Sequence, residues 1–581
     1  MHTTRVHRPL ALLPLLLLPG CLFVWDGSGS LRRSRTDSAR AAETGPSARM
    51  TAQARISPST LLAHVEVLAS DAYEGRLPGT RGEDLTVDYL VRQSKQIGLE
   101  PGTPDGSYVQ QVPLLGFRTQ ATGSFRAKER EVALEIGKDA VALTRWQEGE
   151  AVVDASPIVF VGYGIEAPEY GWDDYKGLDV RGKTLVMLVN DPPVRDPNDA
   201  TKLDASTFGG KPMTYYGRWT YKYEIAAKKG AAACVIVHQT EPASYPWSVV
   251  LSSWSKENFD LRSPVKGRDR AAIESWITLE KALELFGACG QDFRALERLA
   301  ATREFRPVEL GATASFRAKN TTREVLSRNV VAKLTGADAA RRDELVVYTA
   351  HWDHLGRNES LTGDQIMNGA VDNATGCAGV LAIAEAFANG PRPPRSILFL
   401  WVTAEEQGLL GSRWYAENPL HPLEKTLANV NMDSLNPWGK TSDVVCIGHG
   451  QSTLDEVLAD CARAQGRTVK PDPMPEKGGY YRSDHFEFAK AGVPGLYADG
   501  GEDVVGRPAG WGRGKIQDFT AKHYHQADDE VQIDWDLSGA AQDMELLHAV
   551  GARVASDAAW PAWKPTSEFK ARREAMLRAR P

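Results

Sequence analysis

Between residues 327 and 555 the apolar positions fall into two alternating kinds of run. The first kind is short and continuous, as in buried strands, and occurs at 344–349, 396–402, 444–447 and 493–498. The second kind has helical spacing and occurs at 378–388 and 535–555. Strands that alternate with helices favour a parallel arrangement with helices on both faces. The sequence therefore predicts an α/β fold with a mixed, mostly parallel sheet.

Residues 56–130 open with two helical patterns. Ser57 and Pro58 are typical of a helix start, and a second helix over 83–97 is expected to end at Gly98. These helices have no sheet partner of their own nearby. We therefore expect 56–130 to complete the domain formed by 315–560, with 561–581 as a C-terminal tail.

Residues 140–310 have a different pattern, in which short β-rich runs are separated by turns. Strands are predicted at 158–164, 184–189 and 233–238, and a helix at 221–229. No plausible cluster of metal ligands occurs in this stretch. It is interpreted as a β-rich domain inserted into the α/β domain, without chemistry of its own.

The N-terminus has the composition of an export signal. Two arginines, Arg5 and Arg8, precede an apolar run over 10–18, and Gly20-Cys21 follows. This resembles the lipobox of bacterial lipoproteins, which implies a signal over 1–21, a lipid on Cys21 and a protein exported to the cell envelope and anchored to a bacterial membrane. A plain signal peptide with an incidental cysteine is the alternative. Residues 22–55 are predicted to be a flexible linker.

Composition excludes two classes of site. The net charge of −7 offers no basic field, so no nucleic-acid partner is expected. Five cysteines remain after Cys21, and no two stand at metal-ligand spacing. Neither a disulfide framework nor a thiolate metal site is predicted.

Acids and histidines follow the predicted strands of the α/β region. They are His351, Asp372, Glu405-Glu406, Asp433 and His525. In an open α/β sheet, ligands bind beyond the carboxyl ends of the strands, so these side chains are expected to meet there. Imidazoles together with carboxylates suit zinc, which accepts nitrogen and oxygen ligands together.

The motifs that hold these residues resemble those of the M28 family of co-catalytic zinc peptidases over residues 325–556. They are His351-x-Asp353-His354, Asp372-Asn373-Ala374-Thr375-Gly376, Thr403-Ala404-Glu405-Glu406-Gln407-Gly408, Asn431-Met432-Asp433, Ser483-Asp484-His485 and Tyr524-His525. The inserted region, with Gly162-Tyr163-Gly164 and Asp174-Tyr175-x-Gly177, is similar to the protease-associated (PA) domain that such enzymes carry. The resemblance implies a zinc-exopeptidase-like fold with an inserted PA-like domain.

The resemblance also implies a division of roles. Two zinc ions would be bridged by Asp372, with His351 and Asp433 on one and Glu406 and His525 on the other. Glu405 would be the general base.

Supporting roles are implied as well. Asp353 would orient His351 through a hydrogen bond, and Tyr480 would stabilise the transition state, with Tyr481 as an alternative. His523 is a rival to His525, whereas His354 and His485 are interpreted as supporting residues.

The activity implied is that of an aminopeptidase acting on peptides with a free N-terminus. Alternatives on the same fold are a carboxypeptidase, a glutaminyl cyclase with one zinc, and a non-catalytic binding module. A carboxypeptidase needs a basic pocket, for which the candidates are Arg482, Arg507, Arg513 and Lys515. The family further implies a cis peptide bond between Asp372 and Asn373.

Overall fold

The computed structural model describes residues 55–579. The predicted signal, Cys21 and nearly all of the predicted linker lie outside the described residues. No helix within 55–579 is long and apolar enough to cross a bilayer. The five cysteines of this part of the chain are free thiols.

The sheet of the α/β region is mixed and mostly parallel. Its strands, in spatial order, are β21 (Thr468–Pro471), β20 (Asp443–Ile447), β22 (Gly495–Gly500), β19 (Thr426–Asn431), β15 (Leu345–His351), β18 (Ser396–Val402) and β14 (Val308–Leu334). The four strands from β22 to β18 run parallel to one another, and β20 and β14 are antiparallel to their neighbours β22 and β18.

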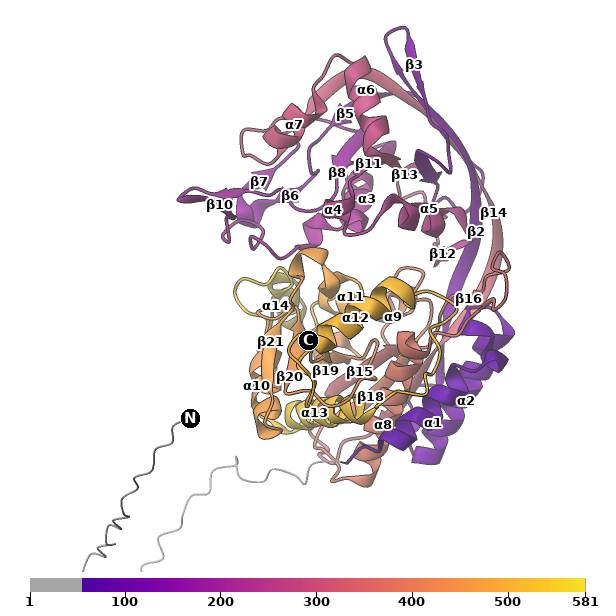
Figure 1. Cartoon of the computed structure of the whole chain (residues 1–581), viewed down its shortest axis with the longest axis vertical. Coiled ribbons are helices and arrows are strands. Elements are labelled where there is room, and N and C mark those ends of the chain that lie inside the picture. The colour runs from indigo at the N-terminus through magenta and orange to yellow at the C-terminus, as the bar shows by residue number, and fades with distance from the viewer. Residues whose placement is uncertain (1–54, 580–581) are drawn as a thin grey trace, which may run out of the picture. The chain divides into compact units, whose positions relative to one another are not determined.

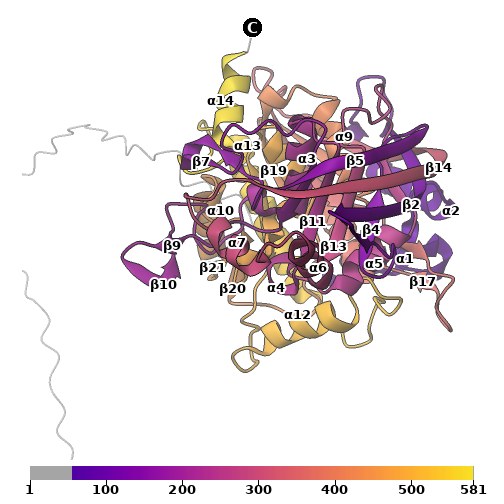
Figure 2. The same cartoon turned by 90° about the horizontal axis from the view of Figure 1, so that it is seen from above.

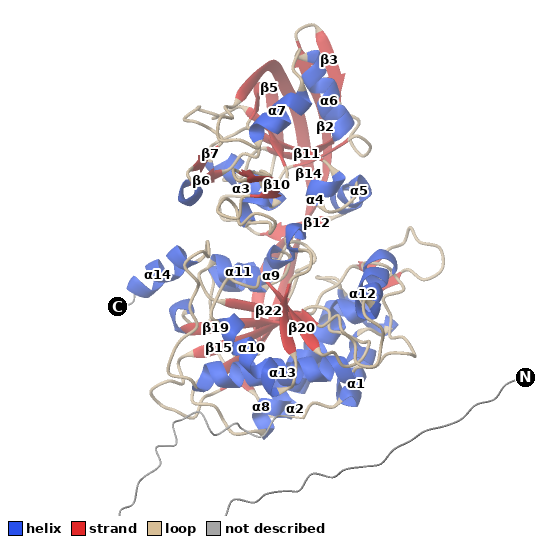
Figure 3. Cartoon of the chain, turned by 60° about the vertical axis from the view of Figure 1, so that its left-hand side comes forward, coloured by secondary structure: helices blue, strands red, loops and turns tan. Residues whose placement is uncertain are grey.

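Helices cover both faces of this sheet, as predicted (Figure 3). Alternate residues of β15 face opposite sides, since Val346 and Tyr348 belong to one hydrophobic cluster and Leu345 and Val347 to another. The first cluster includes α8 (Gly376–Asn389), α10 (Leu454–Ala464) and α13 (Ser538–Ser556), and the second includes α9 (Leu410–Glu417) and α11 (His485–Lys490). A sheet buried on both faces explains why its strands are continuously apolar.

The N-terminal helices pack on the same sheet. α1 (Pro58–Leu68) and α2 (Arg81–Ile97) bury Leu61, Val65 and Leu90 in the cluster that contains Tyr348 of β15. α2 ends at Gly98, whose φ of 86° is the left-handed cap predicted from the sequence.

Two long strands connect the α/β region with the β-rich segment. β2 (Val109–Ala127) and β14 pair antiparallel along their length, and β14 continues from β18 at one end to β5 (Glu150–Phe160) at the other (Figures 1 and 2). The sheet then continues through β8 (Thr184–Leu188), β11 (Ala233–His238), β13 (Ile273–Thr278) and β4 (Ala140–Leu143). The β-rich segment has its own hydrophobic cluster, and all of its residues lie within 125–318.

The helices of the β-rich segment are α3 (Trp219–Lys228), α4 (Thr240–Ala243), α5 (Trp247–Ser255), α6 (Leu279–Ala288) and α7 (Phe293–Ala300). The segment docks on the α/β region through specific contacts. The Met213 amide donates to the Pro475 carbonyl at 3.0 Å, and the Tyr215 ring lies 5.0 Å from that of Phe486. Lys490 forms an ion pair with Glu224 at 3.4 Å.

Candidate metal centre

The predicted ligands gather at the carboxyl ends of neighbouring strands. His351 is the last residue of β15, Glu405 and Glu406 follow β18, and Asp433 follows β19. Asp372 lies in the turn that leads into α8. The parallel register of β15, β18 and β19 brings these side chains to one edge of the sheet, as sequence reasoning expected.

Two imidazoles meet the carboxylates in two neighbouring groups. In the first, His351 Nε2 lies 3.3 Å from Asp372 Oδ1 and 3.2 Å from Asp433 Oδ1. In the second, His525 Nε2 lies 3.2 Å from Asp372 Oδ2 and 3.0 Å from Glu406 Oε2. The two oxygens of Asp372 therefore face different imidazoles, which is the geometry required of a bridging carboxylate.

His351 presents its Nε2 atom to the carboxylates. Its Nδ1 lies 3.1 Å from the main-chain oxygen of Asp353, and because a carbonyl can only accept, Nδ1 carries the proton. This leaves Nε2 as the ligand atom. The sequence predicted that the Asp353 carboxylate would accept this hydrogen bond from His351, but its oxygen lies 3.8 Å from His351 Nδ1. The Asp353 carboxylate instead accepts a hydrogen bond from the Glu405 amide at 3.0 Å.

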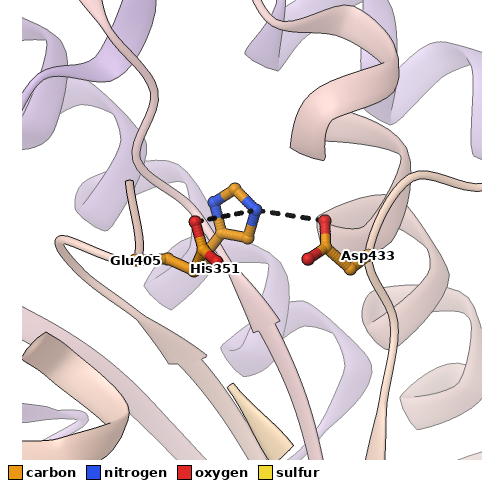
Figure 4. A group of neighbouring side chains, drawn as sticks. All are labelled: His351, Glu405 and Asp433. Carbon is orange, nitrogen blue, oxygen red and sulfur yellow. Dashed lines mark hydrogen bonds and ion pairs between the residues drawn. The ribbon is translucent and has the colours of Figure 1, made fainter. Parts of the chain in front are cut away.

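Glu405 lies beside the first group. Its Oε2 is 3.9 Å from His351 Nε2, opposite Asp433 (Figure 4). Burial raises the pKa of Glu405 well above its usual range, and the positive charge of His351 opposes this shift. His351, Glu405 and Asp433 could also share one cation, so geometry alone permits Glu405 to be a base or a ligand.

A second imidazole, His354, also contacts Glu406. His354 Nδ1 lies 2.6 Å from Glu406 Oε1, whereas His525 Nε2 meets oxygens from both Glu406 and Asp372. His354, Asp372 and Glu406 could also share one cation, so geometry alone permits either His525 or His354 to be the ligand. His523, the rival considered from the sequence, pairs with Asp528 at 3.0 Å.

The concentration of negative charge favours bound cations. Burial lowers the pKa of His525, but Glu406 and Asp372 outweigh it and raise the pKa to about 10. His525 Nε2 is buried and makes no hydrogen bond. The carboxylates of the site need a neutralising positive charge. A site of imidazoles and carboxylates fits zinc, which takes nitrogen and oxygen ligands at about 2.0–2.2 Å.

The turn that carries Asp372 is fixed by its neighbours. The peptide bond between Asp372 and Asn373 is cis, which confirms the prediction. Asp529 accepts hydrogen bonds from the amides of Val371 and Asp372 at 2.9 and 3.1 Å. Gly369 has a φ of 58°, and a Cβ there would lie 2.3 Å from the main-chain oxygen of Asp372, so glycine is required.

A buried arginine supports the same turn. Arg76 donates to the carbonyls of Asn368 and Gly369 and also to those of Leu68 and Trp352. It thereby joins the N-terminal helices to the metal centre. Sequence reasoning missed this role, although Arg76 belongs to a Gly75-Arg76-x-Pro78-Gly79 motif that resembles the start of the catalytic domain.

Tyr480 does not lie in the position that its predicted role requires. Its side chain is 5% exposed, belongs to a hydrophobic cluster with Phe486 and Phe569, and has a hydroxyl without a hydrogen-bond partner. Tyr481 is in the same cluster. Neither tyrosine lines the cavity that Asp372, Glu405 and Asp433 share, so the transition-state role is not supported for Tyr480.

Tyr524 lines that cavity instead. Its ring stacks on His525 with centroids 3.9 Å apart, and 44% of its surface is exposed. The signal that could have found it is its place directly before a predicted ligand.

The cavity beside the carboxylates has a volume of about 290 Å³. Acidic side chains line much of it, and they are Asp372, Glu405, Asp433, Asp472 and Asp499. Arg482, Tyr497 and Tyr524 also line it. Ser483 donates to Asp433 Oδ2 at 2.6 Å, which orients this carboxylate from the same side.

The chain is similar to known proteins over the region that contains this site. Residues 329–548, which contain all the candidate ligands, match the sequence model of Peptidase family M28. The chain is 23% identical over 546 residues to the probable lipoprotein aminopeptidase LpqL of Mycobacterium tuberculosis, covering 90% of each chain. It is 30% identical over 177 residues to leupeptin-inactivating enzyme 1 of Streptomyces exfoliatus, covering 29% of this chain and 38% of that enzyme.

Solved structures with a similar arrangement were also found. An aminopeptidase from Aneurinibacillus sp. strain AM-1 superposes with a TM-score of 0.46 at 18% identity, covering 88% of this chain and 97% of that one. The zinc aminopeptidase BSAP from Bacillus subtilis gives a TM-score of 0.42 at 17% identity, covering 89% of this chain and 98% of that one.

Proposed function

From the match of residues 329–548 to Peptidase family M28 we infer that the chain is a metallopeptidase, and we propose that it is a zinc-dependent aminopeptidase. The observation that carries the proposal is Asp372, whose two oxygens face different imidazoles. The relative LpqL, which aligns over 90% of both chains, is named a probable aminopeptidase.

We propose two zinc ions per chain. Asp372 would bridge them, with His351 and Asp433 completing one site and Glu406 and His525 the other. Zinc, when bound, lowers the pKa of water from 15.7 to about 7 and polarises a carbonyl group. His354 supports this arrangement by holding Glu406 at 2.6 Å.

Glu405 would act as the general base. It takes a proton from the attacking water and returns it to the nitrogen of the leaving peptide. The Asp353 carboxylate accepts the Glu405 amide at 3.0 Å and so fixes the backbone from which the base extends. Tyr524, which lines the cavity, is a candidate donor to the oxyanion that develops on the substrate.

The proposal that the substrate has a free amino terminus is supported by the similarity to LpqL. The cavity beside the candidate ligands carries both signs of charge, because Lys477 and Arg482 line it together with Asp372, Glu405, Asp433, Asp472 and Asp499. Its lining is therefore compatible with the ammonium group of a peptide N-terminus and with a substrate carboxylate.

The decisive experiment compares peptide substrates with free and acetylated N-termini on one sample whose metal content is measured. We expect cleavage of the free substrates alone, with activity lost to a chelator and restored by zinc. Cleavage of acetylated peptides at comparable rates would contradict the aminopeptidase assignment.

We also propose the domain organisation that the sequence predicted. Residues 56–130 and 315–560 would form the catalytic domain, interrupted by a PA-like domain at 140–310. Separate hydrophobic clusters for the two parts support this division.

Export as a lipoprotein remains part of the proposal, since Cys21 lies outside the described residues. The relative LpqL is named a lipoprotein, which supports an envelope location. A Cys21→Ser variant is expected to leave the membrane fraction. Its retention there would contradict the lipid anchor.

A further inference from the structure

A second cavity, of about 350 Å³, extends from the metal centre to the β-rich segment. Glu405, Glu406, Tyr524 and His525 line it on one side. Arg218, Trp219, Tyr223 and Trp254 line it on the other side and belong to the β-rich segment. A peptide bound at the metal centre can therefore reach side chains of the β-rich segment.

Most of the arginines of this cavity are paired with acids. Arg145 and Arg270 both contact Glu274, at 3.3 and 2.9 Å. Arg413 contacts Glu417 at 2.8 Å. Their charges are neutralised within the protein.

Arg218 and Arg482 differ from these arginines. Among residues 55–579, no carboxylate lies within 4.0 Å of either guanidinium. Arg218 Nε is buried and has no hydrogen-bond partner. Burial and then the neighbouring positive charge of Arg482 lower the pKa of Arg218 to about 10.

Arg218 and Arg482 line the same cavity, where the charge of Arg482 repels that of Arg218 and burial removes water from Arg218, which is unfavourable without an anion. An anion bound between them would remove both penalties, and a carboxylate fits the fork of an arginine with two parallel hydrogen bonds. Arg482, unlike Arg218, also lines the smaller cavity with Glu405 and Asp433, which places Arg482 beside the candidate metal centre.

We propose that Arg218 and Arg482 bind a carboxylate of the peptide substrate on the C-terminal side of the bond that is cleaved. The inference rests on the proposed function and names its substrate class. That class is peptides with a carboxylate close behind the N-terminal residue. The carboxylate is the C-terminus of a dipeptide or the side chain of an acidic second residue.

The other basic candidates from the sequence do not share this position. Arg507 lies 4.7 Å over the ring of Trp511, and Arg513 pairs with Glu502 at 2.6 Å. Neither lines a cavity at the metal centre. Arg507 is therefore a matched control for Arg482, since both are exposed arginines on loops.

The test uses the zinc-loaded full chain and four substrates. Leu-Gly and Leu-Gly-amide differ only in the C-terminal charge, and Leu-Glu-amide and Leu-Gln-amide differ only in the side-chain charge. We expect kcat/KM to be about tenfold to a hundredfold higher for the charged member of at least one pair, as hydrogen bonds to a charged group provide. The pair that responds identifies the source of the carboxylate.

Variants of the arginines test whether Arg218 and Arg482 cause the preference for the charged substrate. Arg482→Ala should reduce the ratio within the responding pair to near one, and Arg482→Lys should keep part of it, because lysine retains the charge but not the fork. Arg218→Gln should act in the same direction, and Arg507→Ala should leave the ratio unchanged. If Arg218→Gln fails to fold, the Arg482 series decides the question.

Ratios near one for both pairs in the wild type would overturn the proposal, as would a preference that survives in Arg482→Ala. Calorimetric binding of the same peptides to the Glu405→Gln protein gives the ratios without turnover. If no peptide is cleaved, the aminopeptidase assignment fails, while the binding ratios still test the arginine pair. Equal binding within each pair would overturn it.

Discussion

At the residue scale, the adjacent acids Glu405 and Glu406 have different surroundings. Glu406 contacts the imidazoles of His354 and His525 at 2.6 and 3.0 Å, whereas Glu405 lies 3.9 Å from the imidazole of His351. We expect Glu405→Gln to lower kcat by about 10²- to 10⁴-fold, the range of a positioned general base, with metal content unchanged. Glu406→Gln should instead lose metal. Kinetics with elemental analysis would reverse the assignment if Glu405→Gln lost zinc and Glu406→Gln retained it.

The two tyrosine candidates can be separated in the same way. Tyr524→Phe removes the hydroxyl of a tyrosine that lines the cavity and is expected to lower kcat by about 10²- to 10³-fold, the range of an oxyanion donor. Tyr480→Phe removes a buried hydroxyl that has no partner, so neither activity nor stability should fall. Steady-state kinetics and thermal melting of both variants provide the measurement. A large loss of kcat in Tyr480→Phe alone would restore the original prediction.

The meeting of the candidate ligands at one edge of the sheet could be predicted from the sequence, whereas the position of the tyrosine could not. His351 and Asp433 lie at the ends of apolar strands. The carboxyl ends of parallel strands lie at one edge of an α/β sheet independently of the conformation of the loops. The direction of Tyr480 depends on packing against Phe486 and Phe569, which local sequence does not encode. Arg482 was recognised as a candidate, but its neighbour Arg218 comes from a distant segment and was visible only in the folded chain.

At the element scale, the turn before α8 depends on Asp529. Its carboxylate accepts two amides of the turn that carries Asp372. Asp529→Ala leaves these amides without acceptors and should destabilise the fold by about 1–3 kcal/mol. It should also weaken zinc binding by about 10- to 100-fold, as outer-shell changes do. Denaturant unfolding and zinc titration test this, and unchanged zinc affinity would show that the turn is held by other contacts.

The packing of α13 on α8 carries a pH dependence. His548 of α13 lies 4.2 Å from the Phe387 ring, and burial lowers the pKa of His548 to about 4. The folded state then binds fewer protons than the unfolded state between pH 4 and 6.5, so stability rises with pH across this window. His548→Gln removes the titrating group and should flatten this dependence, by up to about 3 kcal/mol. Parallel pH profiles of unfolding for wild type and variant would contradict the prediction.

The helices and strands were easier to predict than their connections. β11 spans the predicted 233–238, and the cap at Gly98 ends α2 as expected, because apolar runs and glycine caps are local signals. The length of β2 and β14 was not predicted. The exposed middle residues of β2 pair with those of β14, which lies far away in the sequence, and such non-local pairing leaves no local signal.

At the scale of the whole molecule, the metal centre joins elements from most of the α/β region. His351, Asp372, Glu406, Asp433 and His525 come from five separate loops or strand ends, and Arg76 ties them to the N-terminal helices. We expect neutralisation of the negative charge between these loops to stabilise their arrangement. Bound metal and the folded state should be thermodynamically linked.

Metal removal tests this linkage. We expect elemental analysis to find about two zinc ions per chain, and exhaustive chelation to abolish activity and lower the Tm, because a ligand that binds only the folded state stabilises it by about 2.7 kcal/mol at 100 times its Kd. Zinc should restore activity and Tm together, and Asp372→Asn, which weakens the predicted bridge, should reduce both the zinc content and the Tm difference. Active protein with no more than one metal would exclude the two-metal centre. Chelated protein that loses activity at an unchanged Tm would show that the five ligand-bearing segments hold their positions without the metal.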